Sequence, residues 1–254
     1  MRTKTRAPRD DGSLRLSQFL AASGLGSRRS VEDLIATGRI EVNAQTITHP
    51  GHRVDPAKDF VRFDGERVRL PRQWIYLLMN KPEGVITTRE DERGRTSVDE
   101  LLGKFSGRVV PIGRLDRATE GLLLFSNHGE LVHRLLHPKF RQPRTYLAWV
   151  APIPSRPLID EVERGVQIGH GEVSGPAEVQ LLSQKGTSAR VRITLREGKN
   201  REVRRIWKAV GCKVLSLRRV AYAGIVLGDL PVGAVRALSP EEIAILSQRT
   251  GLAL

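Results

Sequence analysis

The sequence predicts an α+β chain of two domains: a small helix-helix-hairpin domain, then a larger domain with a largely antiparallel central sheet flanked by helices. Length is one reason, because 254 residues exceed the roughly 150 of a typical single domain. The other is that strand and helix signals after residue 73 alternate without the regular period of parallel βαβ units. We place the first domain at residues 14–72 and the second at 73–250.

Residues 1–13 precede both domains and have the composition of a tail. They are basic, and apart from the initiator Met they contain no aliphatic residue larger than Ala and Pro. Such a segment cannot contribute to a packed core. We therefore expect a disordered basic tail.

The first domain begins with two short helices. Leu16, Phe19 and Leu20 recur at helical spacing, and Ser27 offers an N-cap to a second helix that Gly38 ends. The strands that follow are expected at 39–43, 60–63 and 66–70. The Asp-Gly pair at 64–65 between the last two strands is typical of a two-residue hairpin turn.

The second domain is assigned from apolar runs and helix-start residues. Asn127 or His128, Ser155, Asn200 and Pro240 lie at or just before helix starts. Helices are expected at 97–102, 129–136, 156–164, 201–210 and 241–247. Strands are expected at 75–79, 109–112, 121–126, 145–151, 177–182, 189–195 and 213–220.

Net charge predicts the kind of partner. The chain carries 42 Lys and Arg against 28 Asp and Glu, a net charge of +14, which favours a polyanion, with nucleic acid ahead of an anionic membrane surface. Residues 1–72 hold 14 basic and 9 acidic residues, whereas residues 190–219 alone hold eleven basic residues against two acidic ones. The second concentration indicates a surface that faces phosphates.

The helix expected at 201–210 lies within that basic segment and has two faces. Val203, Ile206, Trp207 and Val210 follow i, i+3, i+4, i+7 spacing, and a cationic stripe follows the same spacing about 200° round the helix. The stripe consists of Arg201, Arg204, Arg205 and Lys208. One face should therefore pack and the other should bind RNA. The preceding turn contains Lys199, which we add to the RNA-binding residues.

Arg28 and Arg29 are a second candidate for phosphate binding. They occupy the first turn of a predicted helix, where the helix dipole disfavours cations by a few tenths of a kcal/mol. The free N–H groups of a helix start bind phosphate, and two arginines would strengthen such a site.

One polar loop has the features of a catalytic segment. The run from Pro111 to Phe125 places Asp116 between two apolar strands and between Arg114 and Arg117. A carboxylate flanked by cations is expected to stay ionised and can then act as a nucleophile or a base. An Asp in a turn is also common for purely structural reasons, so the residues alone leave both interpretations open.

Several classes of site are excluded or disfavoured. No apolar run approaches the about 20 residues of a membrane span, and no phosphate-loop or dinucleotide-binding glycine motif is present. The single Cys212 excludes an internal disulfide and fits a reducing compartment. His133 and His137 lack the Glu of an H-E-x-x-H motif and a third ligand, so we predict no metal and no cofactor.

A family resemblance makes the function specific. The run G-R-L-D-x-x-T-x-G-L-L-L-F-S-N at 113–127 resembles the catalytic motif of bacterial ribosomal RNA pseudouridine synthases, in the branch with the small-subunit enzyme and its large-subunit relatives. Segments at 80–84, 137–138, 144–146 and 197–205 resemble further family motifs in the same order. Residues 27–29 and 38–43 are similar to parts of an S4 RNA-binding domain. The resemblance covers about residues 14–248.

The resemblance implies a role for each matching residue. Asp116 would be the aspartate essential for breaking the uridine glycosidic bond, whether it attacks the sugar, attacks the base or removes a ribose proton. Arg204 would pair with Asp116, with Arg205 as its rival. Tyr146 would pack against the target uracil, and Arg114 would help to hold the extruded nucleotide.

The expected substrate is ribosomal RNA. Glu202, Trp207 and the lack of a long C-terminal extension look more like the large-subunit enzymes, so 23S rRNA is preferred over 16S rRNA. The alternatives are a tRNA enzyme and a non-catalytic ribosome-assembly factor. We expect a cytoplasmic monomer with no membrane partner.

Overall fold

The computed structural model describes residues 12–26, 28–71, 73–88 and 94–254. The chain folds into two compact units, with the boundary between Trp74 and Ile75. The sequence placed this boundary two residues earlier. Most of the predicted N-terminal tail, residues 1–11, lies outside the described residues, as does the predicted N-cap Ser27.

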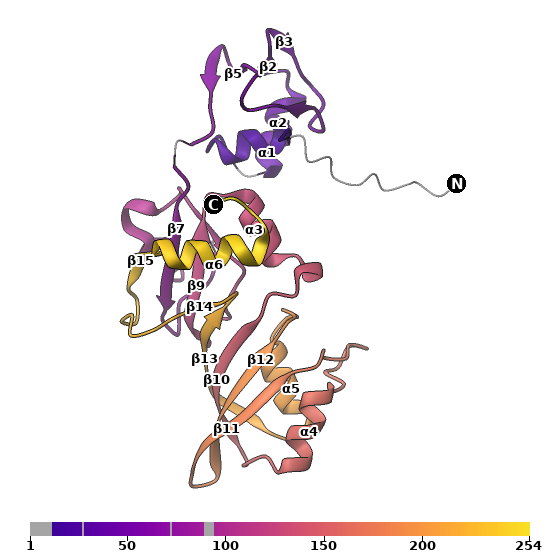
Figure 1. The fold of residues 1–254 in the computed structure, drawn as a ribbon, viewed down its shortest axis with the longest axis vertical. Coiled ribbons are helices and arrows are strands. Elements are labelled where there is room, and N and C mark those ends of the chain that lie inside the picture. Colours follow the sequence, from indigo (N-terminus) through magenta and orange to yellow (C-terminus); the bar gives the residue numbers. More distant parts are fainter. Residues whose placement is uncertain (1–11, 27, 72, 89–93) are drawn as a thin grey trace, which may run out of the picture. The chain divides into compact units, whose positions relative to one another are not determined.

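The first unit has two helices packed on a small sheet (Figure 1). Its four-stranded sheet has the order β3-β2-β5-β6, and a separate pair joins β1 to β4. Asp64 and Gly65 both have positive φ, 48° and 83°, which is the primed turn expected for a two-residue hairpin. The elements are β1 (Leu14–Arg15), α1 (Leu16–Ala22), α2 (Arg28–Ala36), β2 (Ile40–Val42), β3 (Gln45–Thr46), β4 (Arg53–Val54), β5 (Val61–Phe63) and β6 (Glu66–Val68).

The second unit is built on a nine-stranded sheet. Its path is β11-β12-β10-β13-β9-β7-β15, with β14 paired to β13 and β8 paired to β9. All of these pairs are antiparallel except β9 with β13, so the prediction of a largely antiparallel sheet is confirmed. The strands are β7 (Tyr76–Lys81), β8 (Val110–Ile112), β9 (Glu120–Ser126), β10 (Arg144–Ala151), β11 (Glu178–Lys185), β12 (Ser188–Leu195), β13 (Lys213–Tyr222), β14 (Ile225–Val226) and β15 (Val235–Ala237).

Four α-helices and two 3₁₀ segments accompany this sheet: η1 (Glu100–Phe105), α3 (Gly129–Leu136), η2 (Pro138–Phe140), α4 (Arg156–Arg164), α5 (Glu202–Ala209) and α6 (Pro240–Thr250). The helix predicted at 97–102 is instead η1, which starts three residues later and is kinked at Gly103, where φ is 53°. Ser239 caps α6 with its hydroxyl, in a reciprocal capping box with Glu242.

Among the described residues of the second unit, two apolar clusters position the strands around Tyr146. One lies where α4 and α5 pack on β10, β12 and β13, at one end of the unit in Figure 1, and it contains the whole apolar stripe of α5. The other is formed by η1, β7, β9 and the segments next to them. Tyr146 packs against both clusters, so it lies where the two halves of the sheet meet.

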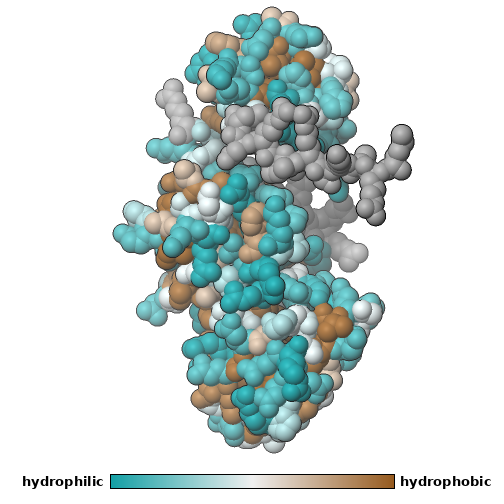
Figure 2. All heavy atoms as spheres, turned by 45° about the vertical axis from the view of Figure 1, so that its right-hand side comes forward, coloured by the Kyte–Doolittle hydropathy of each residue, from teal (hydrophilic) through white to brown (hydrophobic). Residues whose placement is uncertain are grey.

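Hydrophobic residues on the face drawn in Figure 2 lie in small groups among hydrophilic ones. Across the described ranges, no helix has both the length and the apolar character of a membrane span. The same described residues contain no cluster of three or more His, Cys, Asp or Glu side chains that could hold a metal ion.

Candidate active site

Asp116 lies in a loop that runs from β8 back into β9, its antiparallel neighbour in the sheet. The apolar sequence after the loop forms a strand that is buried along almost all of its length, whereas only Ile112 is buried in β8 before it. The side chain of Asp116 is 33% exposed. A partly exposed carboxylate at the end of a buried strand is accessible to a substrate and held by a rigid scaffold.

The segment that follows β7 fixes this loop from the other side. The Thr87 hydroxyl donates to the carbonyl of Leu115 at 2.9 Å and accepts from its N–H at 3.2 Å. The N–H of Gly84 donates to the carbonyl of Arg117 at 2.8 Å, and Arg117 Nε donates to the carbonyl of Gly84 at 3.2 Å. The residues on either side of Asp116 are therefore each held by two hydrogen bonds.

Gly121 brings the loop close to β13. Its φ is 104°, and a Cβ added there would lie 2.3 Å from the carbonyl oxygen of Arg219. Only glycine fits this approach. Arg219 is buried, and its Nε donates to the carbonyl of Leu122 at 2.8 Å. These contacts fix the distance between β13 and the end of the Asp116 loop, where β9 begins.

Tyr146 lies in the same row of the sheet. It pairs with Arg219, and Arg219 pairs with Gly121. Adjacent strands are about 4.8 Å apart, so two strand spacings place the Cα of Tyr146 roughly 10 Å from that of Gly121. The structure therefore brings Tyr146 to the strand end from which the Asp116 loop projects.

Two arginines of the α5 region approach the loop. Arg201 Nη1 lies 3.9 Å from Asp116 Oδ2, and the Arg201 side chain is 52% exposed. Arg204 Nη2 donates to the carbonyl of Ala118 at 2.6 Å, and Nη1 donates to that of Val214 at 3.3 Å. Burial, together with the charge of Arg201, lowers the pKa of Arg204, and Asp116 partly offsets this effect.

The sequence left Arg204 and Arg205 as rival partners of Asp116, and the geometry separates them. Arg204 contacts the Asp116 loop, whereas Arg205 donates to the carbonyls of Ile168 and Gly169 at 2.8 Å and pairs with Glu172 at 2.6 Å. The ion pair that Asp116 makes within the described ranges is with Arg201. Sequence reasoning had placed Arg201 only among the RNA-binding residues.

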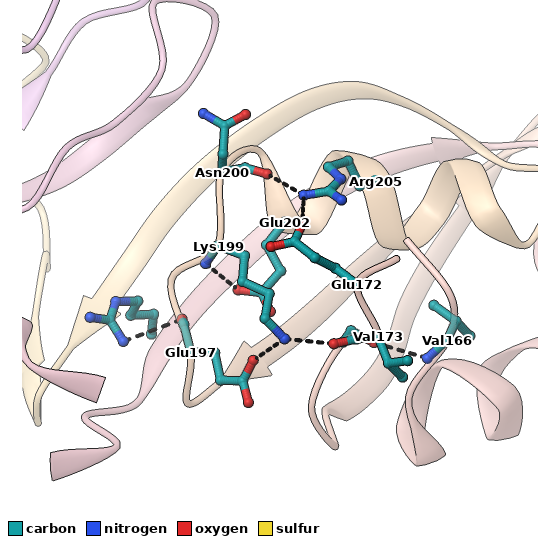
Figure 3. Close-up of polar contacts among 10 residues, drawn as sticks. Val166, Glu172, Val173, Glu197, Lys199, Asn200, Glu202 and Arg205 are labelled. Atoms are coloured by element: carbon teal, nitrogen blue, oxygen red, sulfur yellow. Dashed lines mark hydrogen bonds and ion pairs between the residues drawn. The ribbon is translucent and has the colours of Figure 1, made fainter. Parts of the chain in front are cut away.

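Lys199 and Arg205 belong to an internal network that joins the 166–174 loop to the start of α5 (Figure 3). Lys199 Nζ pairs with Glu197 at 2.6 Å and donates to the carbonyl of Val173 at 2.5 Å. The Lys199 N–H donates to Glu202 at 3.1 Å. Burial raises the pKa of Glu202, and the bond to Glu197 raises the pKa of Lys199. The charges of Lys199 and Arg205 are thus compensated within the protein.

The other predicted RNA-binding residues lie at the surface or at its edge. Arg29, Arg114 and Lys208 are exposed, and none of the three side chains has a hydrogen bond or ion pair with another described residue. The side chain of Arg28 lies outside the described residues. Arg29 is close to the start of α2, as expected.

Lys81 is a feature of the site to which the sequence analysis gave no role. It ends β7 fully buried, and its Nζ donates to the carbonyls of Pro82 and Val85 at 2.7 Å each. Burial lowers its pKa to about 8, and the charges of Glu83 and Asp116 oppose this shift. The feature of the sequence that could have identified Lys81 is its place at the end of an apolar strand.

Comparisons with known proteins agree with this geometry. The family model for RNA pseudouridylate synthases matches residues 75–209, and the S4 domain model matches residues 14–61. A protein of Bacillus subtilis named ribosomal large subunit pseudouridine synthase B is 38% identical over 231 residues, covering 90% of this chain and 93% of the relative. An uncharacterized RNA pseudouridine synthase of Mycobacterium tuberculosis is 41% identical over 249 residues, covering 96% and 97%.

A solved structure has the same fold. A crystal structure of a pseudouridylate synthase superposes with a TM-score of 0.66 at 26% identity, covering 92% of this chain and 99% of that one. The resemblance inferred from the 113–127 motif is therefore confirmed. The chain belongs to the family of RNA pseudouridine synthases, which are isomerases, and its N-terminal unit is an S4 domain.

Proposed function

We propose that this chain converts a specific uridine of ribosomal RNA to pseudouridine, with 23S rRNA as the preferred substrate and Asp116 as the catalytic group. The observation that carries the proposal is the Asp116 loop: the carboxylate is partly exposed, its neighbours Leu115 and Arg117 are held by hydrogen bonds, and Arg201 lies 3.9 Å from it. The B. subtilis relative named for the ribosomal large subunit supports the choice of 23S rRNA.

The reaction rearranges atoms without adding any. The bond between ribose C1′ and uracil N1 breaks, the base turns, and C1′ bonds to C5. The proton on C5 leaves, and N1 gains one. Asp116 as an ionised carboxylate fits attack on the sugar, attack on the base and removal of a ribose proton alike.

The target uridine must leave its stack to reach Asp116, as bases do in other enzymes that modify them. Tyr146 would pack against the extruded uracil, and exposed Arg114, two residues before Asp116, would help to hold the nucleotide. Arg204 would keep the catalytic loop in place through Ala118 and add positive charge near Asp116.

Phosphate contacts would offset the cost of extrusion. Arg28 and Arg29 at the start of α2 would dock RNA on the S4 domain, and Lys208 would extend the contact along α5. Lys199 and Arg205 remain candidates, although an RNA phosphate would have to compete with Glu197 and Glu172 for them. A cytoplasmic location and a monomeric state stay predictions, and light scattering would test the second.

Tritium release tests the substrate directly. Transcripts of 23S rRNA, 16S rRNA and tRNA are made with uridine tritiated at C5, because pseudouridine formation releases that hydrogen. We expect release from 23S rRNA at one site. Release from 16S rRNA or tRNA alone would contradict the substrate, and no release from any RNA, including RNA in assembly intermediates, would contradict the proposal as a whole.

A further inference from the structure

A patch of one aromatic and three arginine side chains lies on the outer face of the S4 sheet. Val61 and Val68 face α1 and α2 and belong to the core of the unit. Because side chains alternate along a strand, their neighbours project to the opposite face. This outer-face patch consists of Phe60, Arg62, Arg67 and Arg69, and all four side chains are exposed.

The position of Phe60 is fixed by its backbone. Its carbonyl accepts from the N–H of Asn43, and its N–H donates to the Asn43 side-chain oxygen, both at 2.9 Å. The guanidinium carbon of Arg67 lies 4.1 Å from the centroid of the Phe60 ring, yet Phe60 remains 51% exposed. A ring held in this way loses little freedom when a ligand stacks on it.

Within the described residues, the positive charge of the patch is not neutralised by carboxylates. Arg62 lies directly opposite Arg67 in the β5-β6 register, and like charges in that position destabilise a strand pair. Arg62, Arg67 and Arg69 form no ion pair with any carboxylate among the described residues. Glu41 faces Arg62 from β2, which still leaves the face with an excess of two positive charges.

A contrasting arginine-phenylalanine pair joins the start of β2 to the end of β5. Arg39 lies 4.6 Å from the ring centroid of Phe63, but its guanidinium is paired with Asp64. One arginine-phenylalanine pair is therefore neutralised within the domain, whereas the outer-face patch presents free positive charge beside an exposed ring.

We propose that the outer-face patch binds an unpaired segment of RNA, with a base stacked on Phe60 and adjacent phosphates bound by Arg62 and Arg67. Aromatic rings and guanidinium planes are the groups on which unstacked bases pack, whereas bases inside a duplex have both faces covered. The inference rests on the proposed RNA substrate, and it gives the S4 domain a second contact besides the start of α2.

Binding of the full-length protein to a fluorescein-labelled, unstructured RNA oligonucleotide tests the patch. We expect Phe60→Ala to weaken binding about tenfold, as loss of one base-aromatic stack does. Phe60→Trp should retain affinity, and its indole fluorescence should be quenched by the RNA. Arg62→Gln combined with Arg67→Gln should reduce the slope of log K against log salt concentration by about 1.4. This is the change expected when two phosphate contacts to a single strand are lost.

Arg39→Gln is the matched control. It also removes an arginine that lies over a phenylalanine ring, but the charge of Arg39 is already neutralised by Asp64. It should leave affinity within about twofold of wild type. Thermal unfolding of each variant separates lost binding from lost folding. Wild-type affinity in folded Phe60→Ala, or quenching of Phe60→Trp by ribosomal proteins and not by RNA, would overturn the inference.

Tritium release distinguishes this inference from the proposed function. With enzyme in saturating excess, Phe60→Ala should modify rRNA at the wild-type rate, and the enzyme concentration for half-maximal rate should rise about tenfold. If no RNA releases tritium but binding still depends on Phe60, the proposed function fails and the patch stands. Unchanged concentration dependence in an active enzyme contradicts the patch alone.

Discussion

Replacing Lys81 by Met should change how the stability of the second unit depends on pH. The Lys81 side chain is fully buried at the end of β7, and burial lowers its pKa from 10.5 to about 8. Between these two values the folded unit holds Lys81 neutral while the unfolded chain holds it protonated. Unfolding then takes up a proton, so Lys81 makes the wild type more stable as pH rises from about 8 to 10.5.

The magnitude follows from the size of the shift. One pH unit within this window corresponds to about 1.4 kcal/mol. From about pH 8, where the folded-state lysine is half protonated, to about pH 9.5 the wild type should gain about 1.6 kcal/mol of unfolding free energy relative to Lys81→Met. The wild type is compared with Lys81→Met because the other titratable groups contribute equally to the unfolding free energy of both proteins, so their contributions cancel in the difference.

Urea titrations at the two pH values measure this gain. Trp149 and Trp207 lie in the second unit, so a Trp74→Phe background restricts the fluorescence signal to that unit. A difference between wild type and Lys81→Met that stays constant with pH would refute the reasoning. It would mean that Lys81 remains protonated despite its burial.

Three further predictions concern Gly121, the arginines near Asp116 and the start of α2. Gly121→Ala should lower the unfolding free energy by about 3 kcal/mol, because the added Cβ would overlap the Arg219 carbonyl. A loss below about 1 kcal/mol, measured by urea titration, would contradict the close approach of the two strands. Arg201→Gln should slow single-turnover tritium release at least about tenfold more than Arg205→Gln does, because Arg201 lies beside Asp116 and Arg205 is paired with Glu172. Equal rates for the two variants would show that Arg201 has no special role at Asp116. Arg28→Ala combined with Arg29→Ala should reduce the slope of log K against log salt concentration for rRNA binding by about two, and leave the rate of tritium release from bound RNA unchanged. An unchanged slope would show that these two arginines do not contact phosphate.

Local chemistry explains why much of the fold was predictable. The Asp-Gly turn at 64–65 requires positive φ, and the two stripes of α5 require a helix with one buried face, so both were read from short segments. The helix predicted at 97–102 is instead a 3₁₀ segment at Glu100–Phe105, and Gly103 within it adopts a conformation that no regular helix contains. Arg201 has φ 50° and acts as the N-cap residue in place of the predicted Asn200.

The partners of the cationic residues could not be predicted from local sequence. Arg205 looked like free positive charge, but its partner Glu172 lies 33 residues earlier, in a loop without helical or strand periodicity. The carbonyl of Val173, which accepts from Lys199, lies in the same loop, although the ion-pair partner of Lys199, Glu197, is only two residues away. The nearness of Arg201 to Asp116 likewise depends on how α5 packs against the sheet. Sequence spacing identifies the face of a helix, and tertiary packing decides which side chain meets the carboxylate.

The most direct test of the central claim is pseudouridine formation by Asp116→Asn, because this substitution removes the carboxylate charge with almost no change in shape. The variant should unfold at the same urea concentration as wild type and bind rRNA with the same affinity, but release no tritium above background. Turnover by folded Asp116→Asn at a rate within about tenfold of wild type would contradict the assignment of Asp116 as the catalytic group.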